Sequence, residues 1–267
     1  MKLLKIIGLF TLFMITFIYT EKVINISLDQ DEIMIKIKEC TDYNIKPINA
    51  TIQEDTIIPG SIGKNINNEL SYKAMKKIGY FEPSLLVYEN IYPEISIYNN
   101  YNKYIIKGNT NNKSVSLLYI LNTNNTIDNL KQITKKYNIK INIFIDSNYL
   151  NNNIEVIDKL KNNEIYNYGN NGIYTKDNLI ITNNIINNKS NNKSIYCLFK
   201  EKNENSLNNC ANIKMFSIIT KDINYFNINL ENGNIFLINN TQELNKIIEY
   251  IISKGFNIVP LSELIYE

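Results

Sequence analysis

The pattern of apolar and polar positions is most regular in the second half of the chain. Between residues 113 and 267, apolar runs of strand length alternate with segments of helical period. Near-continuous apolar runs are typical of strands that are buried on both faces, as in parallel sheets. The predicted strands span residues 114–121, 141–146, 164–169, 194–199, 215–220 and 234–239, and a short terminal strand ends at Leu261.

The segments between these strands predict helices with one apolar face. A helix over residues 127–137 carries Leu130, Ile133 and Tyr137 on one side. Strands that alternate with helices in this way predict a parallel α/β fold, either a barrel or an open sheet. In the helix predicted to end at Gly255, apolar residues recur at i, i+3, i+4, i+7 and i+8, namely at Leu244, Ile247, Ile248, Ile251 and Ile252.

Residues 25–112 have a less regular pattern. One helix is predicted to begin near Asp29, and a second is predicted over residues 67–79. Short extended segments lie around them, and Pro59-Gly60 marks a turn. We therefore expect a small α+β accessory region that precedes the α/β domain.

The N-terminal segment predicts a membrane anchor. Residues 6–20 are apolar and uncharged, and Lys2 and Lys5 precede them, which is the layout of a signal sequence. No small-residue cleavage site follows, so residues 1–24 are interpreted as an uncleaved signal anchor with a cytoplasmic N-terminus. Cleavage and secretion, or a buried core helix, are the alternatives. The anchor predicts a single-pass protein of the cell membrane whose C-terminal domain is extracytoplasmic.

Composition excludes several classes of function. The chain has 28 basic and 26 acidic residues and no basic stripe, so the charge pattern gives no sign of nucleic-acid binding. It has no histidine. This excludes Ser–His–Asp hydrolases, Cys–His proteases and histidine-containing zinc sites.

Three cysteines remain available for redox chemistry. Outside the cytoplasm they can oxidise, and Cys197 and Cys210 are close enough in sequence to bridge a short loop. The alternative is that these two and Cys40 are all free thiols. No C-x-x-C motif is present, so a zinc or redox motif is not indicated.

The order of elements after residue 113 resembles that of the NodB-homology, or polysaccharide deacetylase, family. Residues 130–145 (LKQITKKYNIKINIFI) are similar to a family helix and strand, and residues 247–265 (IIEYIISKGFNIVPLSELI) are similar to its last helix and strand. The resemblance implies an α/β fold with a distorted, reduced (β/α) barrel at residues 113–267. It covers about the last 150 residues.

The resemblance does not extend to the active-site motifs. The two aspartate positions of the family's T-F-D-D-G motif hold Ile120 and Leu121. In place of the metal-binding motif, which is similar to G-H-E-I-G-N-H, the chain has NNEIYNY, which ends at Tyr168. The second family histidine falls near Gly172, and the histidine of the last strand corresponds to Asn239. The family's R-P-P-Y-G segment is not retained.

The family removes acetyl groups from glycans with a divalent metal held by one aspartate and two histidines. Because those side chains are missing here, the resemblance implies no catalytic residue, no metal ligand and no cofactor. Aromatic faces and amides can still hold sugars. Candidate glycan contacts in the former cleft are Tyr119, Tyr166, Asn167, Tyr168 and Asn239. The alternative is that the tyrosines fill the vacated space.

Three functions remain open from the sequence. The first is a catalytically inactive, membrane-anchored envelope protein that binds peptidoglycan or another glycan. The second is a structural protein that binds a protein partner, and the third is an active carbohydrate deacetylase. The acidic residues Asp146, Glu201 and Asp222 follow predicted strands, but they are interpreted as caps and turn residues.

Overall fold

The computed structural model describes residues 2–123, 127–239 and 241–267. The chain folds as two compact units. The first comprises the chain up to Pro47 together with residues 62–91, and the second comprises residues 48–61 and 92–267. The segment that the sequence assigns to an accessory region, residues 25–112, therefore contributes to both units.

The first unit is a small α+β structure. A pair of antiparallel strands packs with two helices around a core that contains Ile37 and Met75. Asp31 caps the second helix by accepting a hydrogen bond from the backbone N–H of Ile33 at 3.0 Å. The elements are α1 (Lys2–Asp29), α2 (Glu32–Glu39), η1 (Thr41–Tyr43), β3 (Gly63–Ile66), α3 (Asn68–Lys76), η2 (Pro83–Leu85) and β4 (Tyr88–Ile91).

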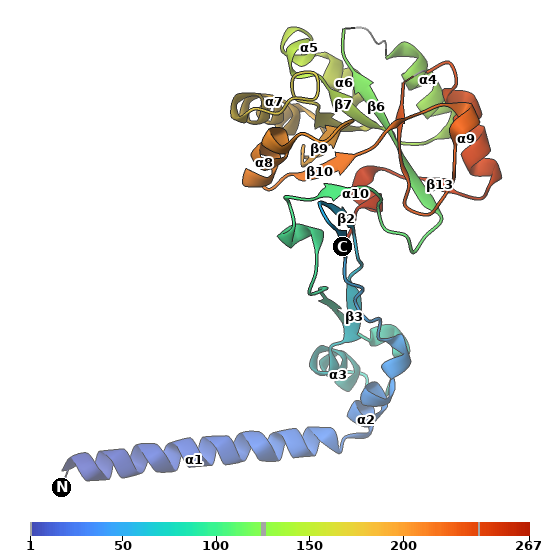
Figure 1. Ribbon diagram of the computed structural model, residues 1–267. Helices are drawn as coiled ribbons and strands as arrows, with labels where there is room; N and C mark the ends of the chain where they lie inside the picture. Colours follow the sequence, from blue (N-terminus) through green and yellow to red (C-terminus); the bar gives the residue numbers. More distant parts are fainter. Residues whose placement is uncertain (1, 124–126, 240) are drawn as a thin grey trace. The chain divides into compact units, whose positions relative to one another are not determined.

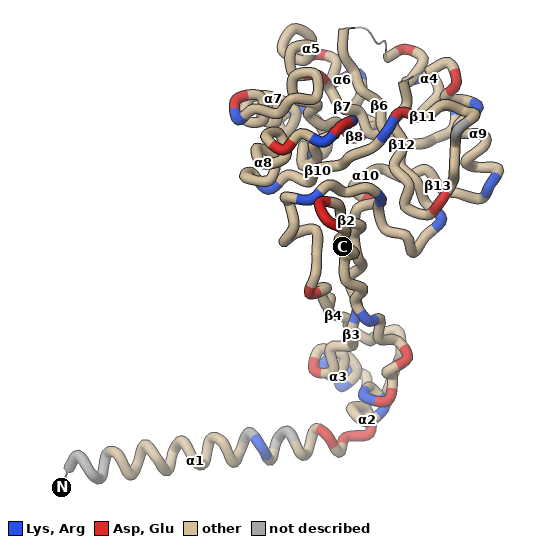
Figure 2. Tube along the Cα trace, viewed as in Figure 1, with Lys and Arg blue, Asp and Glu red and all other residues tan. Residues whose placement is uncertain are grey.

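The helix predicted for residues 1–24 is present as α1 and continues to Asp29. Figure 2 shows that the stretch from Ile7 to Thr20 carries no charged residue, and its large apolar side chains are exposed. Among the helices of the described residues, none is both long and apolar enough to cross a membrane. The structure therefore does not support the membrane anchor predicted for residues 1–24.

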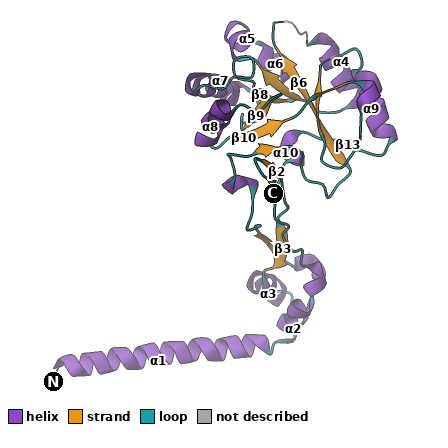
Figure 3. Ribbon diagram, in the orientation of Figure 1, coloured by secondary structure: helices purple, strands orange, loops and turns teal. Residues whose placement is uncertain are grey.

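The second unit contains two largely parallel sheets, which Figures 1 and 3 show between surrounding helices. One sheet has the order β11 (Asp222–Ile223), β12 (Ile235–Ile238), β6 (Ser114–Leu121), β7 (Asn142–Ile145) and β8 (Glu164–Asn167), with β13 (Asn257–Ile258) also paired to β6. The other has the order β1 (Thr51–Gln53), β2 (Thr56–Ile58), β5 (Tyr104–Ile105), β10 (Phe216–Ile219) and β9 (Tyr196–Phe199).

Helices connect and cover these strands. The α-helices of this unit mostly return the chain from one strand to the next parallel strand, as in a βαβ unit. They are α4 (Asp128–Tyr137), α5 (Ser147–Asn152), α6 (Val156–Leu160), α7 (Lys176–Lys189), α8 (Glu204–Asn212), α9 (Leu244–Ser253) and α10 (Leu261–Leu264), and the 3₁₀ helices are η3 (Ile97–Asn99) and η4 (Tyr225–Asn227).

The parallel α/β fold is confirmed, but the closed barrel is not. Among the described residues, β8 and β9 do not pair through their backbones, and neither do β10 and β11. At the first of these gaps, side chains replace the strand ladder. Asn192 exchanges two hydrogen bonds of 2.9 Å with the backbone of Ile165, and the N–H of Asn167 donates to Ser194 Oγ at 3.0 Å. The two sheets therefore remain separate.

Strand side chains alternate between two cores because successive residues point to opposite faces. In β6, Leu117 and Tyr119 pack toward α4 and α9, whereas Leu118 and Ile120 point into the space between the sheets. That space is filled largely by aromatic rings: the ring centroids of Phe144, Tyr166, Tyr196 and Phe216 are 5.1–5.8 Å apart in succession. The strands are thus buried on both faces, as their apolar runs predict.

Candidate functional site

A pocket of about 430 Å³ lies at the C-terminal ends of the parallel strands. This is the end at which barrel and related α/β proteins place their chemistry. The segments that follow β6, β8, β9 and β12 supply its walls. The described lining residues are Ile120, Asn122, Tyr168, Asn171, Gly172, Ile173, Phe199, Lys200, Glu201, Lys202, Asn203 and Asn239.

The structure brings together four positions to which the family resemblance assigns catalytic or metal-binding roles. Ile120, Tyr168, Gly172 and Asn239 come from three different strand ends, and all of them line this pocket. The fifth position, Leu121, is fully buried on the helix-facing side of β6. Four of the five positions to which the resemblance assigns these roles therefore surround one space.

Gly172 has little room for a larger side chain. Its φ is +81°, a left-handed conformation that glycine adopts readily and other residues rarely do. A Cβ atom built on it would lie 3.1 Å from the hydroxyl oxygen of Tyr168. Tyr168 thus occupies the space that a side chain at position 172 would need.

Tyr168 presents a protonated phenol to the pocket. Its side chain is largely buried, and this burial raises the pKa of the hydroxyl, with Asp222 and Asp146 adding a smaller electrostatic effect. The phenol is therefore neutral near pH 7. A neutral phenol can donate one hydrogen bond and offers an aromatic face to a ligand.

Charged side chains on one wall are mostly neutralised by ion pairs. Lys200 Nζ lies 3.1 Å from a carboxylate oxygen of Asp222, and Lys202 Nζ lies 2.8 Å from one of Asp55. Glu201 is the only carboxylate among the described lining residues. The pocket wall is consequently polar without a strong charge of either sign.

Three of the predicted glycan contacts do not reach this pocket. Tyr119 is 2% exposed and packs on the helix-facing side of β6, opposite to its neighbour Ile120. Tyr166 is buried between the sheets, and its hydroxyl donates at 2.5 Å to Glu164 at the other end of β8. Both tyrosines are therefore core residues, whereas Tyr168 and Asn239 line the pocket as expected.

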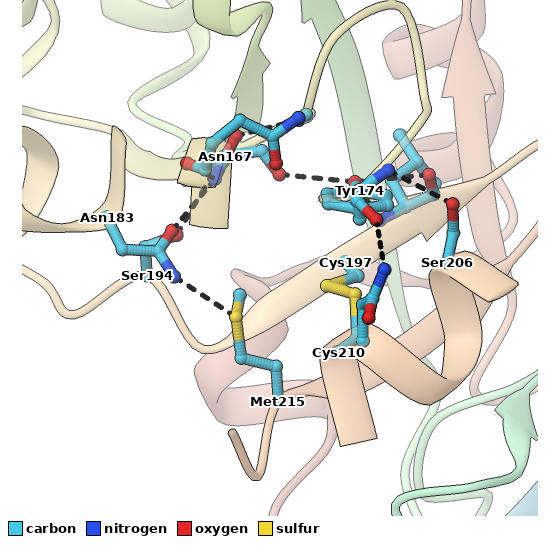
Figure 4. Close-up of a disulfide and its surroundings, with 12 residues drawn as sticks. Asn167, Tyr174, Asn183, Ser194, Cys197, Ser206, Cys210 and Met215 are labelled. Carbon is cyan, nitrogen blue, oxygen red and sulfur yellow. Dashed lines mark hydrogen bonds between the residues drawn. A yellow bond between two sulfur atoms is a disulfide. The ribbon is translucent and has the colours of Figure 1, made fainter. Parts of the chain in front are cut away.

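Asn167 is the third predicted glycan contact that does not line the pocket. It holds neighbouring elements together. Its amide NH₂ donates to the carbonyl of Asn178 and to Asn183 Oδ1, both at 3.1 Å. Its Oδ1 accepts from Ser147 Oγ and from the N–H of Gly169. Figure 4 shows its side chain directed to Asn183. Most of these partners are buried protein groups, so Asn167 links β8 to α5 and α7.

A disulfide joins Cys197 of β9 to Cys210 of α8, which is the bridged alternative that the sequence left open (Figure 4). Both residues are fully buried. The loop closed by this bond contains the pocket-lining residues from Phe199 to Asn203. Beside it, Tyr174, which the sequence did not single out, accepts a hydrogen bond of 2.7 Å from the N–H of Leu198.

At the end of β7, Asp146 binds backbone N–H groups, whereas Asp222 pairs with Lys200. Asp146 accepts hydrogen bonds from the N–H groups of Asn148 and Tyr149 at the start of α5, and from that of Asn171 at 2.7 Å. It is therefore a helix cap, as interpreted from the sequence. Over the described residues, no three His, Cys, Asp or Glu side chains converge as a metal site requires. The donor set at the former metal positions does not fit the family's cation.

Comparisons with known proteins agree with this fold. No protein-family model matches the chain. The uncharacterized protein YlxY of Bacillus subtilis (strain 168) is 30% identical over 126 residues, which is 46% of this chain and 40% of YlxY. The match therefore spans less than half of the length of that relative.

Solved structures align over more of the chain. BA3943 of Bacillus anthracis, a CE4 family pseudoenzyme, aligns with 88% of this chain and 95% of its own (TM-score 0.62, 22% identity). A BA3943 mutant with restored enzymatic activity aligns with a TM-score of 0.61 and 21% identity, over 88% and 98%. The peptidoglycan N-acetylglucosamine deacetylase Bc1960 covers 61% and 92% (TM-score 0.53, 16% identity). The resemblance deduced from sequence is thereby confirmed, and this chain has the fold of the CE4, or polysaccharide deacetylase, family.

Proposed function

We propose that this protein is a non-catalytic member of the deacetylase fold that binds a glycan in the strand-end pocket. The observation that carries the proposal is the set of residues at the former catalytic positions. Ile120, Tyr168, Gly172 and Asn239 surround an open pocket but supply neither an ionisable base nor a metal ligand of the family's kind. The site is retained as a cavity while its chemical groups are replaced.

Hydrolysis of an acetyl group needs an activated water and a group that transfers protons. The Ile120 side chain has no polar atom, and the Asn239 amide does not ionise near neutral pH. Tyr168 keeps its proton because burial raises its pKa. Glu201 remains, but it does not stand at a position to which the resemblance assigns a catalytic or metal-binding role. These residues support binding better than turnover.

Binding of a sugar is within the reach of the same residues. The volume of about 430 Å³ lies in the range of roughly 300–1,000 Å³ that is usual for small-ligand pockets. Tyr168 offers a ring face and a hydroxyl donor, and the amides of Asn171, Asn203 and Asn239 offer donors and acceptors to hydroxyl and acetamido groups. Because nearby ion pairs neutralise Lys200 and Lys202, the pocket favours a neutral acetylated sugar over a charged one.

The comparisons support the two parts of this proposal. BA3943 is described as a pseudoenzyme, which agrees with a CE4 fold that lacks activity. Bc1960 is described as a peptidoglycan N-acetylglucosamine deacetylase, which makes peptidoglycan fragments the first ligands to try.

An extracytoplasmic location is part of the same proposal. The disulfide between Cys197 and Cys210 is a bond that persists in oxidising compartments. Alkylation of free thiols in intact cells, followed by mass spectrometry, would show both cysteines oxidised. A membrane tether through α1 stays a prediction from the sequence, which cell fractionation can test.

The test of glycan binding uses the full chain and oligosaccharides of N-acetylglucosamine, with and without a peptide stem. Calorimetry is expected to show binding that Tyr168→Ala weakens at least tenfold, since the ring and its hydroxyl are removed. Tyr266→Ala is the matched control because Tyr266 is an exposed tyrosine that does not line the pocket.

The same preparations decide between binding and catalysis. The proposal expects no acetate release above the rate of the buffer, even with added Zn²⁺. Acetate release that depends on the metal would instead establish an active carbohydrate deacetylase. If the intact chain binds none of these glycans, the proposal fails, and a search for a protein partner by crosslinking becomes the appropriate next step.

A further inference from the structure

A second, larger cavity lies at the opposite ends of the strands from the candidate glycan site. It is a groove of about 830 Å³. Three connections form it: the end of α4 with the loop to β7, the end of α6 with the loop to β8, and the loop between α7 and β9. Its described lining is Lys131, Thr134, Lys135, Asn138, Ile139, Lys140, Lys159, Lys161, Asn162, Asn163, Glu164, Asn191 and Asn192.

The lining of this lysine groove is strongly basic. It holds five lysines and a single carboxylate, Glu164, although the whole chain has a net charge of only +2. Glu164 is already engaged, because it accepts hydrogen bonds from the hydroxyls of Tyr166 and Ser262. Lys161 pairs with Asp158 at 2.7 Å. Within the described part of the chain, no carboxylate lies within 4 Å of the other four groove lysines, Lys131, Lys135, Lys140 and Lys159.

Stabilisation of helix ends explains only part of this charge. Lysines in the last turn of a helix interact favourably with its C-terminal carbonyl groups, and Lys135 and Lys159 occupy such positions in α4 and α6. Each helix end carries roughly half a negative charge, so two ends offset about one lysine. Lys131 lies a full turn earlier in α4, and Lys140 follows the helix, so the groove keeps a surplus of positive charge.

The groove also exposes a polar group that the fold leaves unused. Asn163 is 7% exposed, and its Oδ1 accepts a hydrogen bond of 3.0 Å from the N–H of Ile141. Its amide NH₂ has no partner among the described residues, although Asn163 lines the groove. Its NH₂ nitrogen is not among the buried polar atoms that lack a partner, so this group is open to solvent in the groove. It adds directed N–H donors to the lysine charges around it.

We propose that this groove binds a flexible polyanion, specifically a phosphodiester polymer without aromatic bases. Lysine ammonium groups are compact cations that bind phosphate oxygens without fixed geometry, which suits a chain of repeating charges. Proteins that bind single-stranded nucleic acid add aromatic side chains on which the bases stack. The described lining has no aromatic residue, so the groove offers charge without a stacking surface. The proposal is independent of glycan binding at the other end of the strands.

The test measures binding of the full chain to inorganic polyphosphate, to poly(glycerol phosphate) and to single-stranded DNA at several salt concentrations. Lys140→Gln/Lys159→Gln is expected to weaken binding of both phosphate polymers at least tenfold at low salt. The slope of log K against log salt should fall in magnitude by roughly 1.4, because two phosphate contacts are lost.

Lys246→Gln/Lys254→Gln is the matched control, since it removes the same charge from exposed lysines of the same unit that do not line the groove. Circular dichroism verifies that both variants fold. If both variants lose the same affinity for the phosphate polymers, the loss is due to the change in net charge alone, and the proposed binding site in the groove is refuted. Failure of both phosphate polymers to bind at low salt would overturn it as well, and equally tight binding of DNA would overturn the assignment to a base-free polymer.

Discussion

The Cys197–Cys210 disulfide gives the sharpest quantitative prediction about the fold. A disulfide stabilises a protein mainly by reducing the entropy of the unfolded chain, and the loop closed here has a sequence separation of 13 residues. For a loop of this length the chain-entropy relation gives about 3 kcal/mol. The bond also joins two fully buried sulfur atoms, so their removal would add a packing cost.

Two perturbations separate these contributions. Reduction under mild conditions breaks the bond but leaves both sulfur atoms in the core, whereas Cys197→Ala/Cys210→Ala removes them. Urea titration followed by far-ultraviolet circular dichroism measures each stability. With a slope of about 2 kcal/mol per molar urea, reduction should lower the midpoint by about 1.5 M, and the double variant should lower it further.

The bond should also control the pocket loop. Residues 199–203 lie inside the closed loop, and outside contacts such as the hydrogen bond from the N–H of Asn203 to the hydroxyl of Tyr104 hold it only in part. Reduction should therefore speed amide hydrogen exchange in residues 199–210 and leave the strands β6 and β7 protected. A midpoint shift below about 0.3 M, or exchange that rises equally in all strands, would refute this reasoning.

Three further predictions follow from buried or paired groups. The hydrogen bond from Lys76 lowers the pKa of Asp31 from its ordinary 3.8 to about 2. The ionised carboxylate therefore stabilises the first unit above pH 3.8, and this stabilisation is lost as the pH falls toward 2. An NMR titration should show that midpoint, and Lys76→Met should return it toward 3.8. Glu267→Gln should destabilise the second unit by about 2 kcal/mol in thermal unfolding, because the buried carboxylate accepts from the N–H groups of Gly60 and Ile97 and an amide NH₂ cannot replace both oxygens. Tyr174→Phe should cost about 1–3 kcal/mol in urea unfolding because it leaves the buried N–H of Leu198 unpaired; a change below 0.5 kcal/mol would contradict this assignment.

The strands of the second unit could be predicted from the sequence because they are buried on both faces. Such strands form continuous apolar runs that polar loops interrupt, and the run at residues 114–121 coincides with β6. The stripe of α9 is equally readable, although Ile252 turns out to be exposed. Short polar helices such as α8 carry few apolar positions, so periodicity gave no signal for them. The two gaps between sheets depend on side chains such as Asn192, whose role no local pattern reveals.

The candidate site could be predicted only in part for a related reason. Alternation tells neighbouring residues apart, but in a strand apolar on both faces it does not say which set points inward. The sequence analysis placed both Tyr119 and Ile120 at the cleft, although neighbouring strand residues point to opposite faces, and the structure assigns the pocket to Ile120. Tyr166 shares the inward face with Tyr168, yet it lies deeper and its hydroxyl turns to the other end of β8. Whether an inward-facing residue of β8 lies in the core or at the pocket depends on its position along the strand, and a residue pattern does not supply that position.

The distribution of aromatic side chains bears on why a pocket persists without its former chemistry. Phe144, Tyr166, Tyr196 and Phe216 pack with aliphatic side chains in the space between the sheets, so the core there is built from the chain's own side chains. If the former metal positions had simply been converted to core, Tyr168 and Ile120 would be expected to close over one another, because empty volume in a core is destabilising. Both side chains are buried, at 6% and 7% exposure, and belong to the core between the sheets, yet a pocket of about 430 Å³ with a polar rim remains beside them. A pocket that binds a glycan can be distinguished by experiment from one that is only part of the core. Asn239→Trp should leave the unfolding midpoint unchanged, because Asn239 is exposed. The same substitution should abolish glycan binding, because the larger side chain occupies the pocket. A variant that binds normally would show that the open pocket is not the binding site.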